Sequence, residues 1–362
     1  MRLLIQPGDG IDSLIKAING AKGSVEIVIF RFDRVEIERA LEQAAKRGVR
    51  VHALIAYTNR GGERGLRKLE MRLLAAGITV ARTANDLARY HDKYMIIDRR
   101  ELFLLSFNFT RLDIENSRSF GLVTRRRELV QEAVRLFEAD TKRQAYKPEI
   151  DTFVVSPVNA RKQLAAFIKG AKKELLIYDP EIADAAMIRF LQERLEAGID
   201  IRIIGKLASK KAKIAARKLS RIRLHTRTII RDGVDAFIGS QSLRETELDA
   251  RREVGVIFRD RKVIGSLREI FEKDWETTEK AAERATPEPS APSPRQVAKK
   301  VAKEVAKKLP PMASVVKVVV RDLGGPNGDL ELDRERVQET VEQAVAEAVR
   351  EAVTDVVEEA AK

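Results

Sequence analysis

The sequence predicts an α/β protein whose two halves share one internal order, each half a mixed sheet flanked by helices, with a small α/β module at the C-terminus. Three observations support this fold class. Short apolar strands alternate with amphipathic helices, which is the pattern of sheets covered by helices. The order of these elements repeats along the chain, and one polar motif occurs in each half.

The first half, residues 1–145, contains an apolar strand at 24–30. A helix at 35–47 follows, with apolar residues at helical spacing and Gly48 directly after its end. The next strand, at 49–57, is again rich in apolar residues. The other predicted elements are a helix at 65–76, strands at 78–81 and 120–124, and a helix at 128–141.

The second half, residues 146–284, repeats this order. The stretch GIDIRIIGK, which begins at residue 198, matches GVRVHALIA, which begins at residue 48. Two halves related by a pseudo-two-fold axis would bring equivalent residues together at their interface. The predicted elements are strands at 174–178, 199–204, 222–224 and 254–258, and helices at 182–196, 206–220 and 263–277.

The helix predicted at 206–220 is very basic and stands directly before the second copy of the motif. Its lysines could line a groove that binds phosphates. A solvated surface explains the same charges, and the sequence leaves both interpretations open.

One polar motif, H-x-[KR]-x4-D, is present twice. The first copy comprises His91, Lys93 and Asp98, and the second comprises His225, Arg227 and Asp232. The chain has three histidines, and two of them carry the motif. A random histidine would match about once in 100, so two matches among three are expected by chance on the order of a few times in 10,000.

The spacing of the motif indicates phosphate chemistry. On a strand, residues two apart point to the same face, so each histidine would lie beside a fixed cation. The cation opposes protonation of the imidazole, so a histidine beside a fixed cation is a poor choice for a purely structural position. The same pair is suitable for binding a phosphate, because the cation neutralises the phosphate oxygens. Hydroxyl and amide groups two residues apart follow each motif and could donate to the same phosphate: Ser106 and Asn108, then Ser240 and Ser242.

Two such clusters supply two imidazoles to one reaction. One can attack phosphorus and form a phosphohistidine, while the other protonates the leaving oxygen and then activates water or an alcohol. The alternative is two buried histidines held by ordinary hydrogen bonds. We favour that alternative for an isolated histidine such as His52, but not for a repeated constellation.

These motifs resemble the phospholipase D superfamily, whose HKD signature is H-x-K-x4-D followed by Gly-Ser-x-Asn. The resemblance covers roughly residues 1 to 280. It implies that the two motifs meet at one active site, with His91 as nucleophile and His225 as general acid and base. It also implies that Lys93, Arg227, Asn108, Ser240 and Ser242 hold the phosphate, that Glu253 orients a histidine, and that Asp98 and Asp232 complete the motif.

The sequence departs from this signature at four places. Arg227 replaces the second lysine, and its planar fork is not equivalent to an ammonium group. Leu105 replaces the first glycine, and Ser242 replaces the second asparagine. Glu253 fits the position of a carboxylate that orients a histidine, whereas Ser119 occupies the matching place in the first half. A weakened or specialised second half is therefore one interpretation.

Composition narrows the classes of function. The chain has no cysteine and only three histidines, so we expect no disulfide, no metal site and no cofactor. The formal net charge of +13 suits an anionic phosphodiester, either a nucleic acid or an acidic lipid surface. No segment has the pattern of a signal peptide or a membrane span, which predicts a cytoplasmic protein, with peripheral membrane contact as an option.

Two further segments follow the second half. Residues 285–312 form a Pro/Lys/Ala-rich linker with a short basic amphipathic helix, which can dock on an anionic membrane or act as a spacer. Residues 313–362 have a strand–turn–helix pattern. The long amphipathic helix of this module predicts contact with a protein partner or with a second copy of the chain.

Three functions are compatible with the sequence. The first is a metal-independent phosphodiesterase or phosphatidyltransferase acting on phospholipids, because superfamily chains with two motifs often resemble cardiolipin synthases. The second is an endonuclease or other nucleic-acid phosphodiesterase, which the basic second half favours. The third is a catalytically weak protein that binds DNA or acidic membranes, which the altered second motif suggests.

Overall fold

The protein is described by a computed structural model that covers residues 1–57, 63–209, 214–219 and 221–283. These residues belong to one compact unit, Met1–Ala285. The predicted linker at 285–312 and the module at 313–362 lie outside the described residues and stay predictions. In the part of the chain that is described, no helix is long and apolar enough to cross a membrane.

The first half is built on a mixed sheet. In sheet order its strands are β1 (Arg2–Gln6), β8 (Ser117–Thr124), β7 (Glu101–Leu105), β6 (Tyr94–Ile97), β2 (Ser24–Ile29), β3 (Arg50–Ile55) and β4 (Thr79–Arg82). Strands β2, β3 and β4 pair in parallel, and the other pairs are antiparallel. The helices are α1 (Asp12–Gly20), α2 (Val35–Lys46), α3 (Glu63–Ala75), α4 (Arg111–Glu115) and α5 (Arg127–Lys142).

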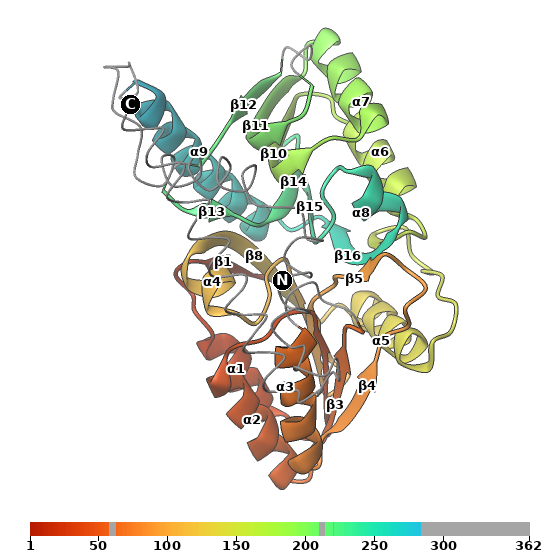
Figure 1. Cartoon of the computed structure of the whole chain (residues 1–362). Helices are drawn as coiled ribbons and strands as arrows, with labels where there is room; N and C mark the ends of the chain where they lie inside the picture. The colour runs from red at the N-terminus through yellow and green to blue at the C-terminus, as the bar shows by residue number, and fades with distance from the viewer. Residues whose placement is uncertain (58–62, 210–213, 220, 284–362) are drawn as a thin grey trace, which may run out of the picture. The chain divides into compact units, whose positions relative to one another are not determined.

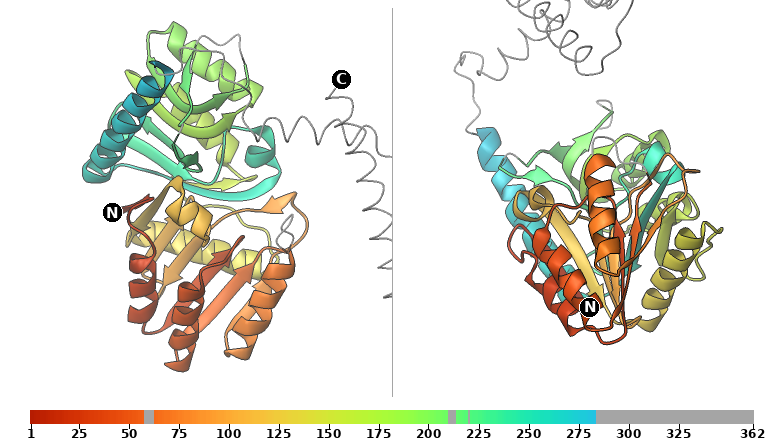
Figure 2. Two further views of the ribbon diagram at one scale, coloured as in Figure 1. Left: turned by 60° about the vertical axis from the view of Figure 1, so that its left-hand side comes forward. Right: turned by 60° about the horizontal axis from the view of Figure 1, so that its bottom comes forward.

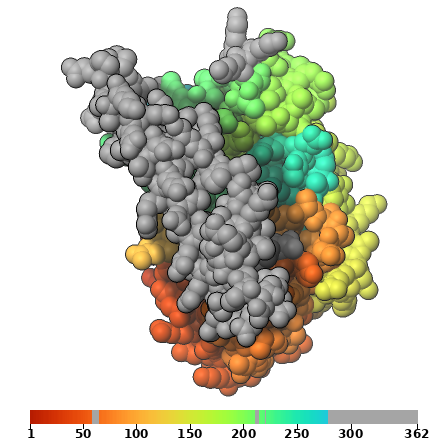
Figure 3. All heavy atoms as spheres, in the orientation of Figure 1, coloured from red at the N-terminus to blue at the C-terminus, as the bar shows by residue number. Residues whose placement is uncertain are grey.

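The second half repeats this topology, which confirms the predicted fold class for the two halves (Figure 1). The green and cyan residues of the second half lie above the red and orange residues of the first half in Figure 3. In sheet order its strands are β12 (Ala215–Arg217), β11 (Asp200–Leu207), β10 (Glu174–Ile182), β14 (Arg227–Arg231), β15 (Asp235–Gly239), β16 (Arg251–Phe258) and β9 (Phe153–Ser156). The helices are α6 (Ala160–Lys169), α7 (Ala185–Glu196), α8 (Glu245–Asp249) and α9 (Arg261–Glu283).

Helices cover the outer face of each sheet (Figure 2). Helix α2 shows why the sequence folds this way, because Ile37, Leu41 and Ala44 share one helical face and are all fully buried. The chain leaves this helix through Gly48, whose φ of +84° lies in the left-handed region that glycine adopts easily. The second half uses α6 and α7 in the same way.

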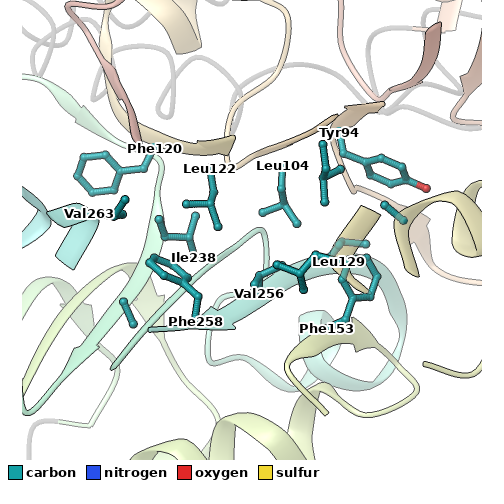
Figure 4. Close-up of a cluster of buried hydrophobic side chains, with 14 of the residues drawn as sticks. Tyr94, Leu104, Phe120, Leu122, Leu129, Phe153, Ile238, Val256, Phe258 and Val263 are labelled. Atoms are coloured by element: carbon teal, nitrogen blue, oxygen red, sulfur yellow. The ribbon is translucent and has the colours of Figure 1, made fainter. Parts of the chain in front are cut away.

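A central core joins the two halves (Figure 4). Leu104 and Leu122 of the first sheet face Ile238 and Val256 of the second sheet in this cluster. These side chains alternate along each strand with those that pack on the outer helices. Helices α5 and α9 contribute to the same cluster, and each fully buried large aliphatic side chain stabilises the fold by about 1.5–3 kcal/mol.

Each half also contributes one short strand to the sheet of the other half. Strand β5 (Arg89–Tyr90) belongs to the first half in sequence but pairs in parallel with β16. Strand β13 (Arg223–Leu224) belongs to the second half but pairs in parallel with β8. Both exchanged strands stand directly before a motif histidine, so the exchange brings the two motifs to the boundary between the halves.

The helix predicted at 206–220 is wrong. Strand β11 continues to Leu207, and β12 forms the edge of the sheet beside β11, as β4 does beside β3. Lysine and alanine favour helices as a local preference, but pairing with the sheet overrides it here. Residues 210–213 and 220 of this stretch lie outside the described residues. The sequence analysis also missed β1, α1, β9 and α6.

A close contact between two strands gives a test of the core. A Cβ added at Gly255 of β16 would come within 2.4 Å of Cε2 of Phe237. We expect Gly255→Ala to lower the free energy of unfolding by about 1–3 kcal/mol, because the core has no space for the methyl group. Denaturant unfolding of the purified protein measures this change, and a variant as stable as the wild type would contradict it.

The matched control is Gly265→Ala in α9. An added Cβ there meets no side chain or neighbouring element within 4 Å among the described residues. We expect this control to raise the free energy of unfolding by about 0.5–1 kcal/mol, because alanine loses less backbone entropy than glycine in a helix.

Candidate active site

The motif residues lie where the chain crosses from one sheet to the other. His91 and Lys93 are in the link between β5 and β6, while His225 precedes Arg227, the first residue of β14. The prediction that each histidine and its cation share a continuous strand is therefore wrong. Each cation instead bends back to its own histidine, where Lys93 Nζ donates to the main-chain oxygen of His91 and Arg227 Nη1 donates to that of His225 at 2.6 Å.

His91 is held by the second half. Its main-chain N–H donates to Arg252 O at 2.8 Å, which continues the parallel pairing of β5 with β16. The same register brings Glu253 level with His91, and Glu253 Oε2 lies 2.9 Å from His91 Nδ1. The ring of Phe30 packs edge-on against the imidazole at a centroid distance of 4.6 Å. The imidazole is thus fixed from two sides, with Nδ1 committed to the carboxylate.

His225 is held by the first half through the equivalent register. Its main-chain N–H donates to Arg118 O at 3.0 Å, as the pairing of β13 with β8 requires. This register brings Ser119 level with His225. Nδ1 of His225 has no hydrogen-bond partner among the described residues, and Asp113 Oδ2 lies 3.4 Å from it.

The two imidazoles share one electrostatic environment. The pKa of His91 lies well below its usual value because of burial first, and then because of the charges of Lys93 and Arg227. Burial also lowers the pKa of His225 well below its usual value, followed by Arg227, Arg223, Lys93 and His91. Because cations of both halves act on both rings, the two motifs share one electrostatic environment, and that environment favours the neutral imidazole in the free protein.

Lys93 is 2% exposed, and its burial lowers the pKa of the ammonium group to about 7. Glu253 opposes this shift and Arg227 adds to it. The pKa of Glu253 is raised in turn, chiefly by burial. The site therefore holds its cations without full compensation, and an anionic phosphodiester would stabilise them.

The polar residues after each motif differ in what they contact. Ser106 Oγ donates to Phe120 O at 2.7 Å, and Ser240 Oγ accepts from the main-chain N–H of Val254 at 3.1 Å. Both hydroxyls thus connect neighbouring strands, and contact with a substrate stays a prediction. Ser242 Oγ accepts from Arg227 Nε at 3.1 Å, so it positions the cation.

The amide of Asn108 lies beside the carboxylate of Asp113. Its Nδ2 donates to Asp113 Oδ2 at 2.6 Å, while its Oδ1 has no hydrogen-bond partner among the described residues. Leu105, which stands where the signature has glycine, fits because Gly121 is opposite it in the sheet. A Cβ at Gly121 would come within 2.9 Å of Leu105 Cδ2.

Asp98 and Asp232 lie at the far ends of the motifs from the histidines. Asp98 accepts main-chain N–H groups of Lys22, Gly23 and Ser24 at 3.0, 2.6 and 2.9 Å. Asp232 accepts the equivalent N–H groups of residues 172–174 at 2.7–3.1 Å. These contacts hold the turn before β2 and the turn before β10, so both carboxylates stabilise the sheets on which the site is built.

Three further residues border the site. Asp113 and Glu247 each stand five residues after the last polar residue of their motif, and each accepts a main-chain N–H from that residue, Asn108 at 2.8 Å and Ser242 at 2.7 Å. This repeated spacing was a signal that the sequence analysis did not use. Phe30, at the end of β2, carried no such signal. No cluster of potential metal ligands is present among the described residues.

The comparisons with known proteins identify the family of the chain. The family model described as "Cardiolipin synthase, PLD-like domain" matches residues 14–141 and 164–275. The chain belongs to the phospholipase D superfamily. The two matched segments fall in the two halves of the structure, which confirms the resemblance seen in the motifs.

Related proteins of the superfamily match part of the chain. The mitochondrial cardiolipin hydrolase of Canis lupus familiaris is 31% identical over 131 residues, which is 35% of this chain and 49% of that protein. The same protein of Mus musculus gives the same identity over 56% of its length, so the chain spans about half the length of these curated relatives.

Solved structures show the same fold. The polyphosphate kinase of Porphyromonas gingivalis has a TM-score of 0.64 at 18% identity, covering 75% of this chain and 46% of that chain. The phosphatidylserine synthase of Haemophilus influenzae Rd KW20 has a TM-score of 0.57 at 11% identity, covering 76% and 85%. At these identities the likeness concerns the fold alone.

The contacts of Asp98 with three main-chain N–H groups give a test of stability. We expect Asp98→Ala to lower the free energy of unfolding at pH 7 by about 1–2 kcal/mol, because three main-chain N–H groups lose a charged acceptor and water replaces it only in part. Burial opposes ionisation, but these N–H groups hold the pKa of Asp98 below its usual value. The stabilisation should therefore be complete above about pH 4 and decrease as the pH falls further.

Denaturant unfolding at pH 7 and below pH 4 measures this difference. The control is Asp12→Asn, which changes an exposed carboxylate at the start of α1. If Asp98→Ala were as stable as the control at pH 7, the bracing role of Asp98 would be rejected.

The lowered pKa of Lys93 predicts a pH dependence of phosphodiester turnover. The ammonium group loses its proton as the pH rises through about 7, so kcat/KM of the free enzyme should decrease up to about tenfold per pH unit above that value. In Lys93→Arg this decrease should disappear from the range below pH 9, since a guanidinium keeps its charge. Steady-state rates on one diester measure kcat/KM against pH for the wild type and for Lys93→Arg. The control is Lys16→Arg, which changes an exposed lysine. A kcat/KM of the wild type that does not change with pH would contradict the expectation.

Proposed function

We propose that the chain is a phospholipase D-like phosphodiesterase or phosphatidyltransferase that acts on phospholipids through a phosphohistidine. The observation that carries the proposal is the contact of His91 Nδ1 with Glu253 Oε2 at 2.9 Å. With a proton on Nδ1, the lone pair of Nε2 is free on a neutral imidazole, which is the form that attacks phosphorus. Burial and nearby cations keep the pKa of His91 low and so maintain this form.

In the first step, His91 Nε2 attacks phosphorus while the bond from phosphorus to the leaving oxygen breaks. His225 must first take up a proton on Nε2, which the charge of the bound anionic diester favours. The imidazolium of His225 then gives this proton to the leaving oxygen as general acid and returns to the neutral form. Lys93 and Arg227 hold the non-bridging oxygens, where negative charge is concentrated. The products of this step are a free alcohol and a phosphoryl group attached to His91.

In the second step, His225 takes the proton from water or from an acceptor alcohol. The oxygen of that molecule attacks phosphorus, and the bond to His91 Nε2 breaks. Water gives hydrolysis, whereas an alcohol gives transphosphatidylation, as a cardiolipin synthase-like reaction requires. Both steps use residues of both halves, so the halves at 1–145 and 146–284 act together.

Two findings support a lipid substrate. Curated relatives at 31% identity carry the name cardiolipin hydrolase, and the matched family model is named for cardiolipin synthase. The formal net charge of +13 suits contact with an anionic membrane surface. Membrane contact through 285–312, and binding of a partner or a second copy through 313–362, are part of this proposal.

The second candidate is a metal-independent nuclease. Two guanidinium groups favour it, because Arg31 and Arg89 lie 5.7 and 5.4 Å from the centre of the Phe30 ring, which itself contacts His91. Cations placed around the reacting group could bind the neighbouring phosphates of a nucleic acid. A catalytically weak protein that binds DNA or acidic membranes is a third candidate, motivated by Arg227 in place of lysine.

A turnover assay with EDTA present separates these candidates. The wild type and His91→Ala are given vesicles of phosphatidylcholine and phosphatidylglycerol and, separately, labelled single- and double-stranded DNA. We expect head-group release or cardiolipin formation by the wild type, with a loss of at least about 10³-fold in the variant. DNA cleavage lost in the variant would establish the nuclease instead, and tight salt-dependent binding without turnover would favour the binding protein.

The covalent intermediate gives a sharper test of the two histidine roles. In His225→Ala the first step lacks its acid and the second lacks its base, so phosphoryl-His91 should accumulate when the leaving group needs no protonation, as with a nitrophenyl diester. An alkaline quench followed by ³¹P NMR detects the P–N bond. Accumulation in His91→Ala rather than in His225→Ala would reverse the two roles, and exposed Glu115→Gln serves as the matched control.

A further inference from the structure

The two histidines of the site have unequal partners. The parallel register of β5 on β16 brings His91 level with Glu253, and the equivalent register of β13 on β8 brings His225 level with Ser119. A serine cannot replace a carboxylate as a charged acceptor for an imidazole N–H. Ser119 Oγ is moreover buried without a hydrogen-bond partner among the described residues. Position 119 therefore lacks the carboxylate that Glu253 supplies at the equivalent position of the second half.

Another carboxylate lies close to the ring. Asp113 projects from the short helix α4, is 3% exposed, and places Oδ2 3.4 Å from His225 Nδ1. That nitrogen has no hydrogen-bond partner among the described residues, and it is also buried. A movement of a few tenths of an ångström would bring the two atoms to ordinary hydrogen-bond distance.

We propose that Asp113 is the positioning residue of His225, replacing the carboxylate that position 119 lacks. This inference rests on the proposed function for its catalytic meaning. Asp113 Oδ2 accepts a hydrogen bond from Nδ1–H of His225. This contact stabilises the tautomer with the proton on Nδ1 and turns Nε2 toward the substrate. A histidine in this tautomer can accept a proton on Nε2 and return it to a leaving oxygen.

The other contacts of Asp113 explain why His225 differs from His91. Oδ2 already accepts from the main-chain N–H and the Nδ2 of Asn108, at 2.8 and 2.6 Å, and Oδ1 accepts from Arg223. A carboxylate shared among several donors stabilises an imidazolium less than one devoted to it. His225 therefore releases its proton more readily, which suits an acid and base, whereas Glu253 makes His91 the stronger nucleophile.

The second half offers a direct comparison. Glu247 takes the place of Asp113 there, accepting the main-chain N–H of Ser242 at 2.7 Å and a guanidinium N–H of Arg251 at 3.1 Å. Since Glu253 is also present, the second half has one carboxylate for the loop and another for the histidine. The first half performs both tasks with Asp113, so a single substitution should affect both.

Nuclear magnetic resonance of the full chain tests the proposal without a substrate. The chain has three histidines, so ¹⁵N-histidine labelling gives three imidazoles, with His52 as an internal reference. Two-bond ¹H–¹⁵N correlations show which ring nitrogen carries the proton. We expect His225 to carry it on Nδ1 in the wild type. In Asp113→Asn we expect the Nδ1–H population of His225 to decrease at least about twofold, while His91 and His52 keep their signals.

Two further variants make the test specific. Glu115→Gln removes an exposed carboxylate from the same helix and should leave all three imidazoles unchanged. The double variant Asp113→Asn/Ser119→Glu returns a carboxylate to the register position that Glu253 occupies opposite His91. It should restore the Nδ1–H tautomer of His225, which a purely structural role of Asp113 in α4 would not predict.

The tautomer experiment can fail or succeed independently of the proposed function. The proposal is overturned if wild-type His225 carries its proton on Nε2, or if Asp113→Asn leaves its tautomer unchanged. If Asp113→Asn shifts all three histidines, the double variant decides: recovery at His225 supports the proposal and no recovery rejects it. Loss of turnover on every phosphodiester would reject the proposed function alone, because the tautomer is measured in the free protein.

Discussion

The exchange of two short strands between the halves is the constraint on which the active site depends. β5 pairs with β16 and β13 pairs with β8, and each exchanged strand ends directly before a motif histidine. Each imidazole is therefore placed against the sheet of the opposite half. Because successive residues of a strand point to opposite faces, a slip of one residue would turn Glu253 away from His91. The main-chain hydrogen bonds of β5 and β13 thus determine which side chains contact each motif histidine.

Burial strengthens the electrostatic interactions among the charged side chains of the site. Lys93 and Arg227 are 2% and 8% exposed, and burying a charge without compensation costs several kcal/mol. Glu253 and Asp113 are also buried and offset part of that cost. The remaining uncompensated charge would be balanced by an anionic ligand such as the phosphodiester proposed above. The same burial favours neutral imidazoles in the free protein, which is the form of His91 that the proposed nucleophilic attack requires.

Local patterns were sufficient to predict the fold class and the motif residues, because spacing within a motif and alternation of apolar residues are short-range properties. The sequence could not show that Glu253 serves His91, since this contact joins residues 162 positions apart through strand pairing. Asp113 was missed although its five-residue spacing from Asn108, which Glu247 repeats after Ser242, is a local signal. The stretch at 206–220 misled us for the opposite reason: its local helix preference was real, but pairing with β11 overrode it.

The strand exchange also determines when the candidate site can be completed during synthesis. The ribosome completes all strands of the first half before it reaches residue 253, so a growing chain can pair them while His91 still lacks its carboxylate. A nascent or prematurely terminated chain would therefore carry a motif without an oriented nucleophile. The activity proposed above would therefore begin only after β16 of the second half has emerged and paired with β5.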